Sequence, residues 1–112
     1  MSSDIESISR IDYQPKVVEN DGPVVVQFGA SWCDVTETMG AELADLSDEY
    51  GAVAFSVDID EEGRLAQDHR IADVPTYLAY FRGNIIRRLE RPADVDELEE
   101  FFESVYALDA VS

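Results

Sequence analysis

The chain has 112 residues, of which 25 are Asp or Glu and 8 are Lys or Arg, so its formal net charge at pH 7 is −17. This length is typical of one domain, and an apolar fraction of 46% is enough for a single hydrophobic core. A surface this acidic repels phosphate backbones and anionic lipids, which argues against nucleic-acid and membrane binding. The single cysteine, Cys33, excludes a disulfide within these 112 residues.

The acidic residues run through the whole chain rather than forming a tail. At low salt such charges repel one another, whereas at molar salt a Debye length of about 3 Å screens them. We therefore predict a protein adapted to a salty cytoplasm, the alternative being an ordinary acidic protein. The first residues lack a basic segment followed by an apolar one, and no apolar run approaches the ~20 residues of a membrane helix. These features predict a cytoplasmic protein without a signal peptide.

The first half of the chain predicts an alternation of strands and helices. Residues 5–11 show a weak edge-strand pattern, and residues 12–22 leave room for at most a short helical turn. A β-branched run over residues 24–28 predicts a buried central strand. Apolar residues then recur at helical spacing over residues 33–50, and Gly51 is the expected end of that helix.

The second half predicts another strand and helix, then a hairpin. Residues 52–58 are expected to form a second buried strand, and residues 61–70 a short helix. Residues 76–82 and 85–89 are expected to pair across a tight Gly-Asn turn at residues 83–84.

Asp94 begins the last predicted helix, with Glu97 in a capping-box position. The complete order is strand, short helix, strand, helix, strand, helix, strand, strand, helix. Strand–helix–strand units favour parallel pairing, and the final hairpin adds antiparallel strands. The sequence therefore predicts an α/β protein with a central mixed β-sheet and helices on both faces.

Two segments carry a resemblance to a known family. The run Gly29-Ala30-Ser31-Trp32-Cys33 follows the β-branched strand, and Val74-Pro75-Thr76 precedes a later one. Together they resemble the thioredoxin family over residues 24–102. The resemblance implies a single thioredoxin-like domain over residues 1–112, with three layers. It also implies that Pro75 is cis and lies beside Cys33, whereas the sequence alone would favour the commoner trans state.

The departures from the family pattern concern the active site. The family carries Cys-x-x-Cys at the start of this helix, whereas here Thr36 takes the place of the second cysteine. Gln27 stands where the family has a buried carboxylate, and Ser56 where a lysine pairs with that carboxylate. Gly29 replaces the usual aromatic residue. The resolving thiol, its proton acceptor and the partner of that acceptor are therefore missing together, which indicates a different task for the site.

The chemistry that remains depends on Cys33 and Thr36 as catalytic residues. Helix N-terminal N–H groups and the Thr36 hydroxyl favour a thiolate, whereas Asp34 and Glu37 oppose it. We expect a moderate nucleophile that attacks a disulfide and forms a mixed disulfide. Because no second cysteine is present, an external thiol must resolve that species. The sequence thus predicts thiol–disulfide exchange by a monothiol mechanism rather than a self-contained dithiol cycle.

Two alternatives remain open. In one of them, Cys33 is a small buried hydrophobic residue without a chemical role, as lone cysteines commonly are. In the other, the chain is a non-redox binding module whose groove holds an extended peptide. The residues expected to bind substrate are the same for exchange and for binding: Trp32, Val74, Pro75 and Thr76.

The expected partners are protein or small-molecule thiols and disulfides, and no cofactor or metal is expected. Residues 58–63 resemble the opening of a calcium loop, but the position that requires Glu is occupied by His69. An acidic strand-to-helix turn is the simpler interpretation. We expect a monomer, with a Cys33–Cys33 dimer as an alternative under oxidising conditions.

Overall fold

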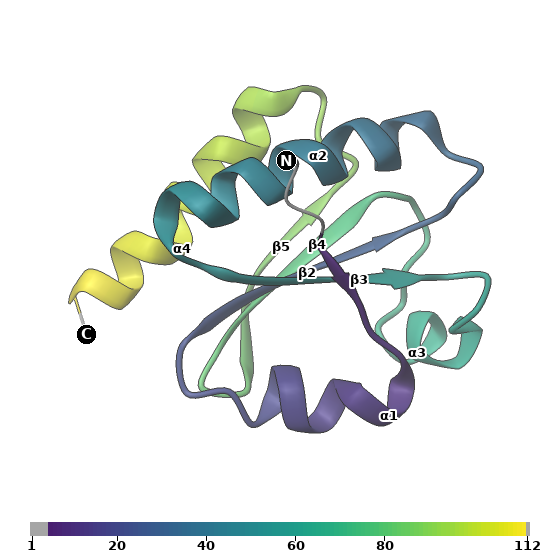
Figure 1. Cartoon of the computed structure of the whole chain (residues 1–112), viewed down its shortest axis with the longest axis horizontal. Helices are drawn as coiled ribbons and strands as arrows, with labels where there is room; N and C mark the ends of the chain where they lie inside the picture. Colours follow the sequence, from purple (N-terminus) through teal and green to yellow (C-terminus); the bar gives the residue numbers. More distant parts are fainter. Residues whose placement is uncertain (1–4, 112) are drawn as a thin grey trace.

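The computed structural model describes the backbone of residues 5–111 and the side chains up to Val105 (Figure 1). Its elements in chain order are β1 (Glu6–Ser7), α1 (Arg10–Tyr13), the π-helical turn η1 (Gln14–Val18), β2 (Pro23–Gly29), α2 (Asp34–Tyr50), β3 (Val53–Asp58), α3 (Gly63–Asp68), β4 (Thr76–Phe81), β5 (Asn84–Glu90) and α4 (Val95–Val111).

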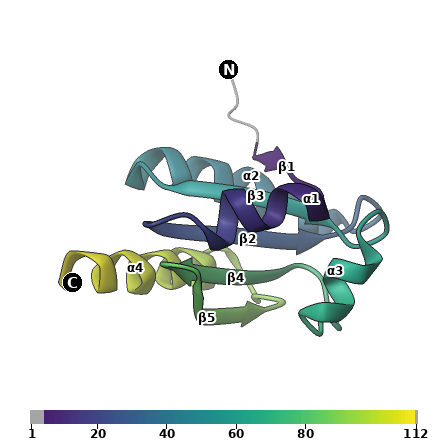
Figure 2. The same cartoon turned by 90° about the horizontal axis from the view of Figure 1, so that it is seen from below.

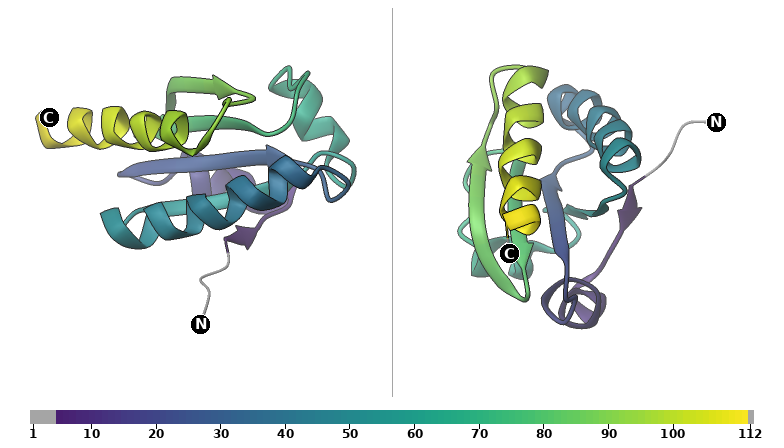
Figure 3. Two further views of the ribbon diagram at one scale, coloured as in Figure 1. Left: turned by 90° about the horizontal axis from the view of Figure 1, so that it is seen from above. Right: turned by 90° about the vertical axis from the view of Figure 1, so that its left-hand side faces the viewer.

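The five strands form one mixed sheet in the order β1-β3-β2-β4-β5. β3 pairs in parallel with β1 and β2, whereas β4 pairs antiparallel with β2 and β5. Helices α2 and α4 lie side by side on one face, and α1 and α3 lie against the other (Figures 2 and 3). The predicted mixed sheet between two helical layers is confirmed.

Strand β2 lies at the centre of the sheet, and its side chains alternate between two hydrophobic clusters. Val24, Val26 and Phe28 contribute to the cluster beneath α1 and α3, whereas Val25 contributes to the cluster beneath α2 and α4. Because both faces are covered, this strand is an unbroken apolar run apart from Gln27 rather than an alternating one.

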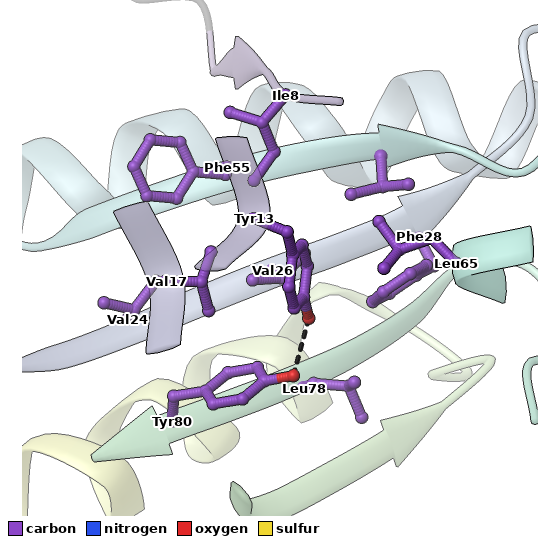
Figure 4. Close-up of a cluster of buried hydrophobic side chains, with 11 residues drawn as sticks. Ile8, Tyr13, Val17, Val24, Val26, Phe28, Phe55, Leu65, Leu78 and Tyr80 are labelled. Atoms are coloured by element: carbon purple, nitrogen blue, oxygen red, sulfur yellow. Dashed lines mark hydrogen bonds between the residues drawn. The ribbon is translucent and has the colours of Figure 1, made fainter. Parts of the chain in front are cut away.

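The cluster beneath α1 and α3 contains a buried polar chain, of which Figure 4 shows the bond between Tyr13 and Tyr80. The hydroxyls of Tyr13 and Tyr80 lie 2.6 Å apart, and the Tyr80 hydroxyl lies 3.1 Å from Nε2 of His69. Nδ1 of His69 lies 2.9 Å from the carbonyl oxygen of Leu65, which can only accept. In the neutral imidazole, Nδ1 therefore carries the proton, Tyr80 donates to Nε2, and Tyr13 donates to Tyr80. Every polar atom of this chain has a partner.

The N-terminal segment differs from its prediction. The strand expected over residues 5–11 is limited to Glu6–Ser7, and α1 begins at Arg10. Residues 10–18 are helical rather than a single short turn, because α1 runs directly into the π-helical turn η1, which takes in Pro15 without ending the helix. Tyr13 and Val17 anchor this segment in the core, while Ile11 faces solvent.

The hairpin turn lies one residue earlier than predicted. Phe81 pairs with Asn84, so the two turn residues are Arg82 and Gly83, with φ of 53° and 82°. Positive φ at both positions is the requirement of a type I′ turn, which matches the twist of the strands. A Cβ atom at Gly83 would lie 2.6 Å from the carbonyl oxygen of Val18, so close packing also requires glycine there.

The remaining elements lie close to their predicted bounds. α2 starts at Asp34 with Cys33 as its N-cap, and it ends at Gly51, whose φ is 63°. α3 is shorter than predicted, at Gly63–Asp68. β3 is not buried along its whole length, because Val53 is exposed and burial alternates along the strand.

The start of α4 shows the predicted cap in altered form. The N–H of Glu97 donates to Asp94 over 3.1 Å, whereas the carboxylate of Glu97 accepts from the N–H of Ala93 rather than from that of Asp94.

Candidate functional site

Cys33 lies where the central strand passes into the long helix. β2 ends at Gly29, and the N–H of Cys33 donates to the carbonyl oxygen of Ala30 over 3.1 Å, which closes the connecting turn. Cys33 is half-buried and is the N-cap of α2, with extended backbone angles. The thiol is therefore placed at the positive end of a 17-residue helix, where a thiolate is favoured.

Thr36 acts directly on this thiol. Its hydroxyl and its backbone N–H hydrogen-bond to the sulfur, and these bonds lower the pKa of Cys33 below its ordinary value. Partial burial opposes the shift, and the charge of Arg91 adds a small further lowering. The Thr36 hydroxyl also accepts a hydrogen bond from the N–H of Ala30 at 3.4 Å. Thr36 thus connects the end of β2 to the sulfur.

Gly29 is required by the position of Thr36. A Cβ atom at residue 29 would lie 2.2 Å from Cγ2 of Thr36, which is closer than any real contact. The glycine that departs from the family pattern is therefore matched to the threonine that replaces the second cysteine. The two departures form one local packing arrangement.

A neutral pair lies behind the thiol. Gln27 is 5% exposed, and its Oε1 accepts a 2.7 Å hydrogen bond from the hydroxyl of the fully buried Tyr77. Burial raises the pKa of Tyr77 well above its ordinary value, and the nearby charge of Cys33 raises it further. Ser56 is the register neighbour of Gln27 on β3, and its hydroxyl lies 3.1 Å from that of Ser7. The buried site therefore carries amide and hydroxyl groups.

The segment before β4 supplies the second side of the site. The Val74–Pro75 peptide bond is cis. The carbonyl oxygen of Pro75 accepts the N–H of Arg91 at 2.9 Å, and Thr76 is buried within the sheet, its hydroxyl donating to the carbonyl oxygen of Asp73. Within the described part of the chain, the backbone of Val74 makes no backbone hydrogen bond. The backbone groups of Val74 are therefore not used by neighbouring backbone in this part of the chain.

Arg91 joins the two sides of the site. Its N–H binds Pro75, and its guanidinium acts on the charge of Cys33. Neither Arg91 nor Tyr77 follows from the sequence motifs, since each reaches the site through strand pairing. The only available signal was the position of Arg91 among several arginines along the predicted hairpin.

An exposed apolar surface flanks Cys33. Trp32 is 66% exposed and Val35 is 44% exposed. The indole N–H of Trp32 donates to Asp60 over 2.8 Å, which fixes the ring beside the turn after β3. That turn, which resembles the opening of a calcium loop in sequence, is held by the Asp58 side chain, which accepts the N–H groups of Asp60 and Glu61.

Comparisons with known proteins agree with this arrangement. The thioredoxin family model matches residues 4–104. The chain belongs to the thioredoxin family. Thiol–disulfide redox chemistry is the general function of that family.

Individual relatives cover most of this chain. The chain is 33% identical over 106 residues to a probable thioredoxin-2 of Caenorhabditis elegans, covering 93% of this chain and 72% of the relative. It is 34% identical over 96 residues to the mitochondrial thioredoxin of Mus musculus, covering 84% of this chain and 58% of the relative. The solved structure of a Malassezia sympodialis thioredoxin superposes with a TM-score of 0.80 at 25% identity, covering 92% of this chain and 91% of that one.

Among residues 5–111, no helix combines the length and the apolar character needed to cross a membrane.

Proposed function

We propose that this chain exchanges thiols and disulfides through Cys33 alone, by a mixed disulfide that an external thiol resolves. The observation that carries the proposal is the position of Cys33 as the N-cap of α2, where the helix N–H groups and the Thr36 hydroxyl lower the pKa of the thiol. It favours the thiolate, which is the attacking species in disulfide exchange.

The reaction is balanced without a second protein thiol. The Cys33 thiolate attacks one sulfur of a substrate disulfide, forms the mixed disulfide and releases the other substrate sulfur as a thiolate. An external thiol then attacks the mixed disulfide and returns Cys33 to its reduced form. Thr36 occupies the position from which a second cysteine would act, and these 112 residues contain no other cysteine.

The substrates proposed are protein or small-molecule disulfides. Trp32 and Val35 offer an apolar contact surface beside the sulfur, and Val74 offers free backbone groups. We propose that the protein is a cytoplasmic monomer. The cytosol keeps thiols reduced, and the exchange needs such an environment.

The test is the pH dependence of Cys33 alkylation together with capture of adducts. The alkylation rate should titrate below the ordinary thiol pKa of about 8.5. Tagged wild-type protein should form covalent adducts on a non-reducing gel, and Cys33→Ser should form none. Catalytic reduction of insulin should be slow. Titration at or above the ordinary value, with no adducts, contradicts the proposal, and rapid insulin turnover contradicts the resolution step.

A non-redox binding module is the second candidate, and the exposure of Trp32 favours it. Trp32 is 66% exposed beside Val35, which is 44% exposed, and an exposed apolar surface of this kind is typical of a contact site. In this case non-covalent capture would be unchanged by Cys33→Ser and lost in Trp32→Ala. Capture that depends on Cys33 instead supports exchange.

A further inference from the structure

Positive charge is gathered in one part of this acidic chain. Residues 64–91 contain six of the 8 Lys and Arg residues and three of the 25 Asp and Glu residues, so their net charge is +3. The rest of the chain has two basic and 22 acidic residues, a net charge of −20. Residues 64–91 include α3, β4 and β5, and β5 is the edge of the sheet remote from β1 (Figure 3). One edge of the molecule is therefore basic.

Most of these arginines are not neutralised inside the protein. Arg64 and Arg88 each form an ion pair with a carboxylate of the same segment. Arg82 lies over the ring of Phe81, which leaves its charge in place. Among the described side chains, no carboxylate forms an ion pair with the four exposed arginines Arg70, Arg82, Arg87 and Arg91. Their charges are available to a partner.

Three of these four arginines occupy left-handed backbone positions. The φ angles are 55° at Arg70, 53° at Arg82 and 43° at Arg91, and within the described residues no other non-glycine residue has a positive φ. Arg70 follows α3 in a turn closed by the hydrogen bond from Ile71 to Ala66, where glycine is usual. Arg82 begins the hairpin turn, where asparagine is usual. Positive charge at these positions costs stability, which indicates a functional demand for it.

The same edge carries backbone groups that the sheet does not use. β5 pairs with β4 on one side, and within residues 5–111 no other backbone hydrogen bond involves residues 84–90. Arg82 precedes the strand, Arg87 lies within it and Arg91 follows it. Seven extended residues span roughly 24 Å. A chain lying along β5 would therefore meet both free backbone groups and cations over its whole length.

Protection of the edge does not account for this arrangement. Charged side chains on an edge strand prevent its pairing with other chains, and Arg87 alone has the right place for that role. Arg70, Arg82 and Arg91 lie in turns outside the strand, where they would not be needed for protection.

Charge complementarity selects an acidic protein segment as the occupant. A second copy of this chain is disfavoured, because each copy carries −17 and two β5 strands side by side would bring their arginines together. Nucleic acid is disfavoured because its phosphates continue beyond the edge, onto a remainder whose charge is −20. A short acidic segment can meet the arginines without reaching that remainder.

We propose that the β5 edge, with Arg70, Arg82, Arg87 and Arg91, is a docking surface for an extended acidic segment of a partner protein, which adds to the sheet beside β5. The docking does not use the Cys33 thiol, so it is independent of the proposed exchange reaction.

The test uses a synthetic peptide of four Glu-Thr repeats with blocked ends, and the same peptide with Gln in place of Glu. Binding is followed by the backbone amide resonances in about 1 M KCl, where a Debye length of about 3 Å screens repulsion by the rest of the surface. The Glu peptide should shift the resonances of residues 84–90 and bind severalfold more tightly than the Gln peptide. Equal binding of the two peptides, or no shifts in β5, would overturn the proposal.

A matched pair of variants separates the edge from net charge. Arg87→Gln should weaken binding of the Glu peptide severalfold and leave Cys33 alkylation unchanged. Arg10→Gln removes the same charge at an exposed position of α1 and should bind as the wild type. Equal weakening in both variants would mean that net charge alone matters, which contradicts a docking surface.

The left-handed positions give a second signature. Arg70→Asn should raise the midpoint of urea unfolding, because asparagine tolerates the left-handed conformation, and it should also weaken binding of the Glu peptide. A lower midpoint with unchanged binding would show that Arg70 serves the fold, which contradicts the demand for charge inferred here.

Three further measurements test the occupant. Tighter binding of a thymidine octanucleotide than of the Glu peptide would replace the acidic segment by nucleic acid. The same β5 shifts on raising the protein concentration without peptide would replace it by a second copy. Cys33→Ser should bind the Glu peptide as the wild type, and loss of binding there would place the peptide at the thiol instead. Each of these three results would overturn the proposal.

Discussion

Two buried tyrosines of β4 lie on opposite faces of the sheet and have different surroundings. Tyr80 belongs to the closed chain with Tyr13 and His69, in which each polar atom has a partner. Tyr77 donates to Gln27, whose Nε2 lies against Gly40 of α2 and has no partner among the described residues. A closed network satisfies every polar group, whereas an open network leaves one buried polar group unsatisfied. The closed network lies beneath α1 and α3, whereas the open one lies on the side of the sheet where α2 carries Cys33 as its N-cap.

Loss of the two hydroxyls should have unequal effects on stability. Tyr80→Phe removes the partner of both Tyr13 and His69 in a dry cluster, so it should lower the free energy of unfolding by about 1–3 kcal/mol. Tyr77→Phe removes the partner of a single acceptor, Oε1 of Gln27, so its cost should be smaller, about 1 kcal/mol. Urea denaturation measures both.

The rate of Cys33 alkylation should respond in the opposite order, changing in Tyr77→Phe and not in Tyr80→Phe. Tyr80→Phe should leave the reaction rate unchanged, because the cluster beneath α1 and α3 does not contact the thiol. Equal losses of stability in the two variants would show that the network around Tyr77 is also closed.

The second test concerns the hydrogen bond that favours the thiolate. Thr36→Val keeps the shape of the side chain and removes the hydroxyl, so the pKa of Cys33 should rise and alkylation at neutral pH should slow severalfold. The exposed Thr38→Val on the same helix is the matched control and should react as the wild type. An unchanged rate in Thr36→Val would contradict the role given to Thr36.

The free energy of unfolding should depend on pH, because the pKa of Cys33 differs between the folded and unfolded states. Because the folded pKa of Cys33 is lowered, its contribution to stability is fully present above the unfolded value of about 8.5 and is lost as the pH falls through the folded pKa. The stability difference between wild type and Thr36→Val should therefore shrink towards acidic pH. Urea denaturation on both sides of the thiol pKa checks the sign.

Local patterns explain which parts of this molecule could be predicted. The β-branched run of β2 and the periodic apolar residues of α2 are set by short-range sequence, so their positions were close to correct. The N-terminal helix is longer than predicted because Pro15 lies in a π-helical turn that continues α1. The hairpin turn was displaced because Arg82 adopts a left-handed conformation that its residue type does not indicate.

The candidate site likewise has one part that could be predicted from the sequence and another that could not. Cys33 and Thr36 are three residues apart on one helix, so their relation could be predicted from spacing. The Tyr77–Gln27 bond and the Arg91–Pro75 bond join distant parts of the chain through strand register.

A series of KCl concentrations tests whether the stability difference between the two tyrosine variants comes from their local hydrogen bonds. The net charge of −17 is spread over the chain, so raising KCl from low to molar concentration should increase the stability of the wild type and of both tyrosine variants in parallel. The differences between variants should then change by no more than a few tenths of a kcal/mol, because hydrogen bonds between neutral buried groups are not screened. Urea denaturation across the KCl series measures this. Flat wild-type stability would remove the prediction of a salt-adapted protein, and a variant difference that varies with salt would mean that surface charge, rather than the closed network, sets the behaviour of Tyr80.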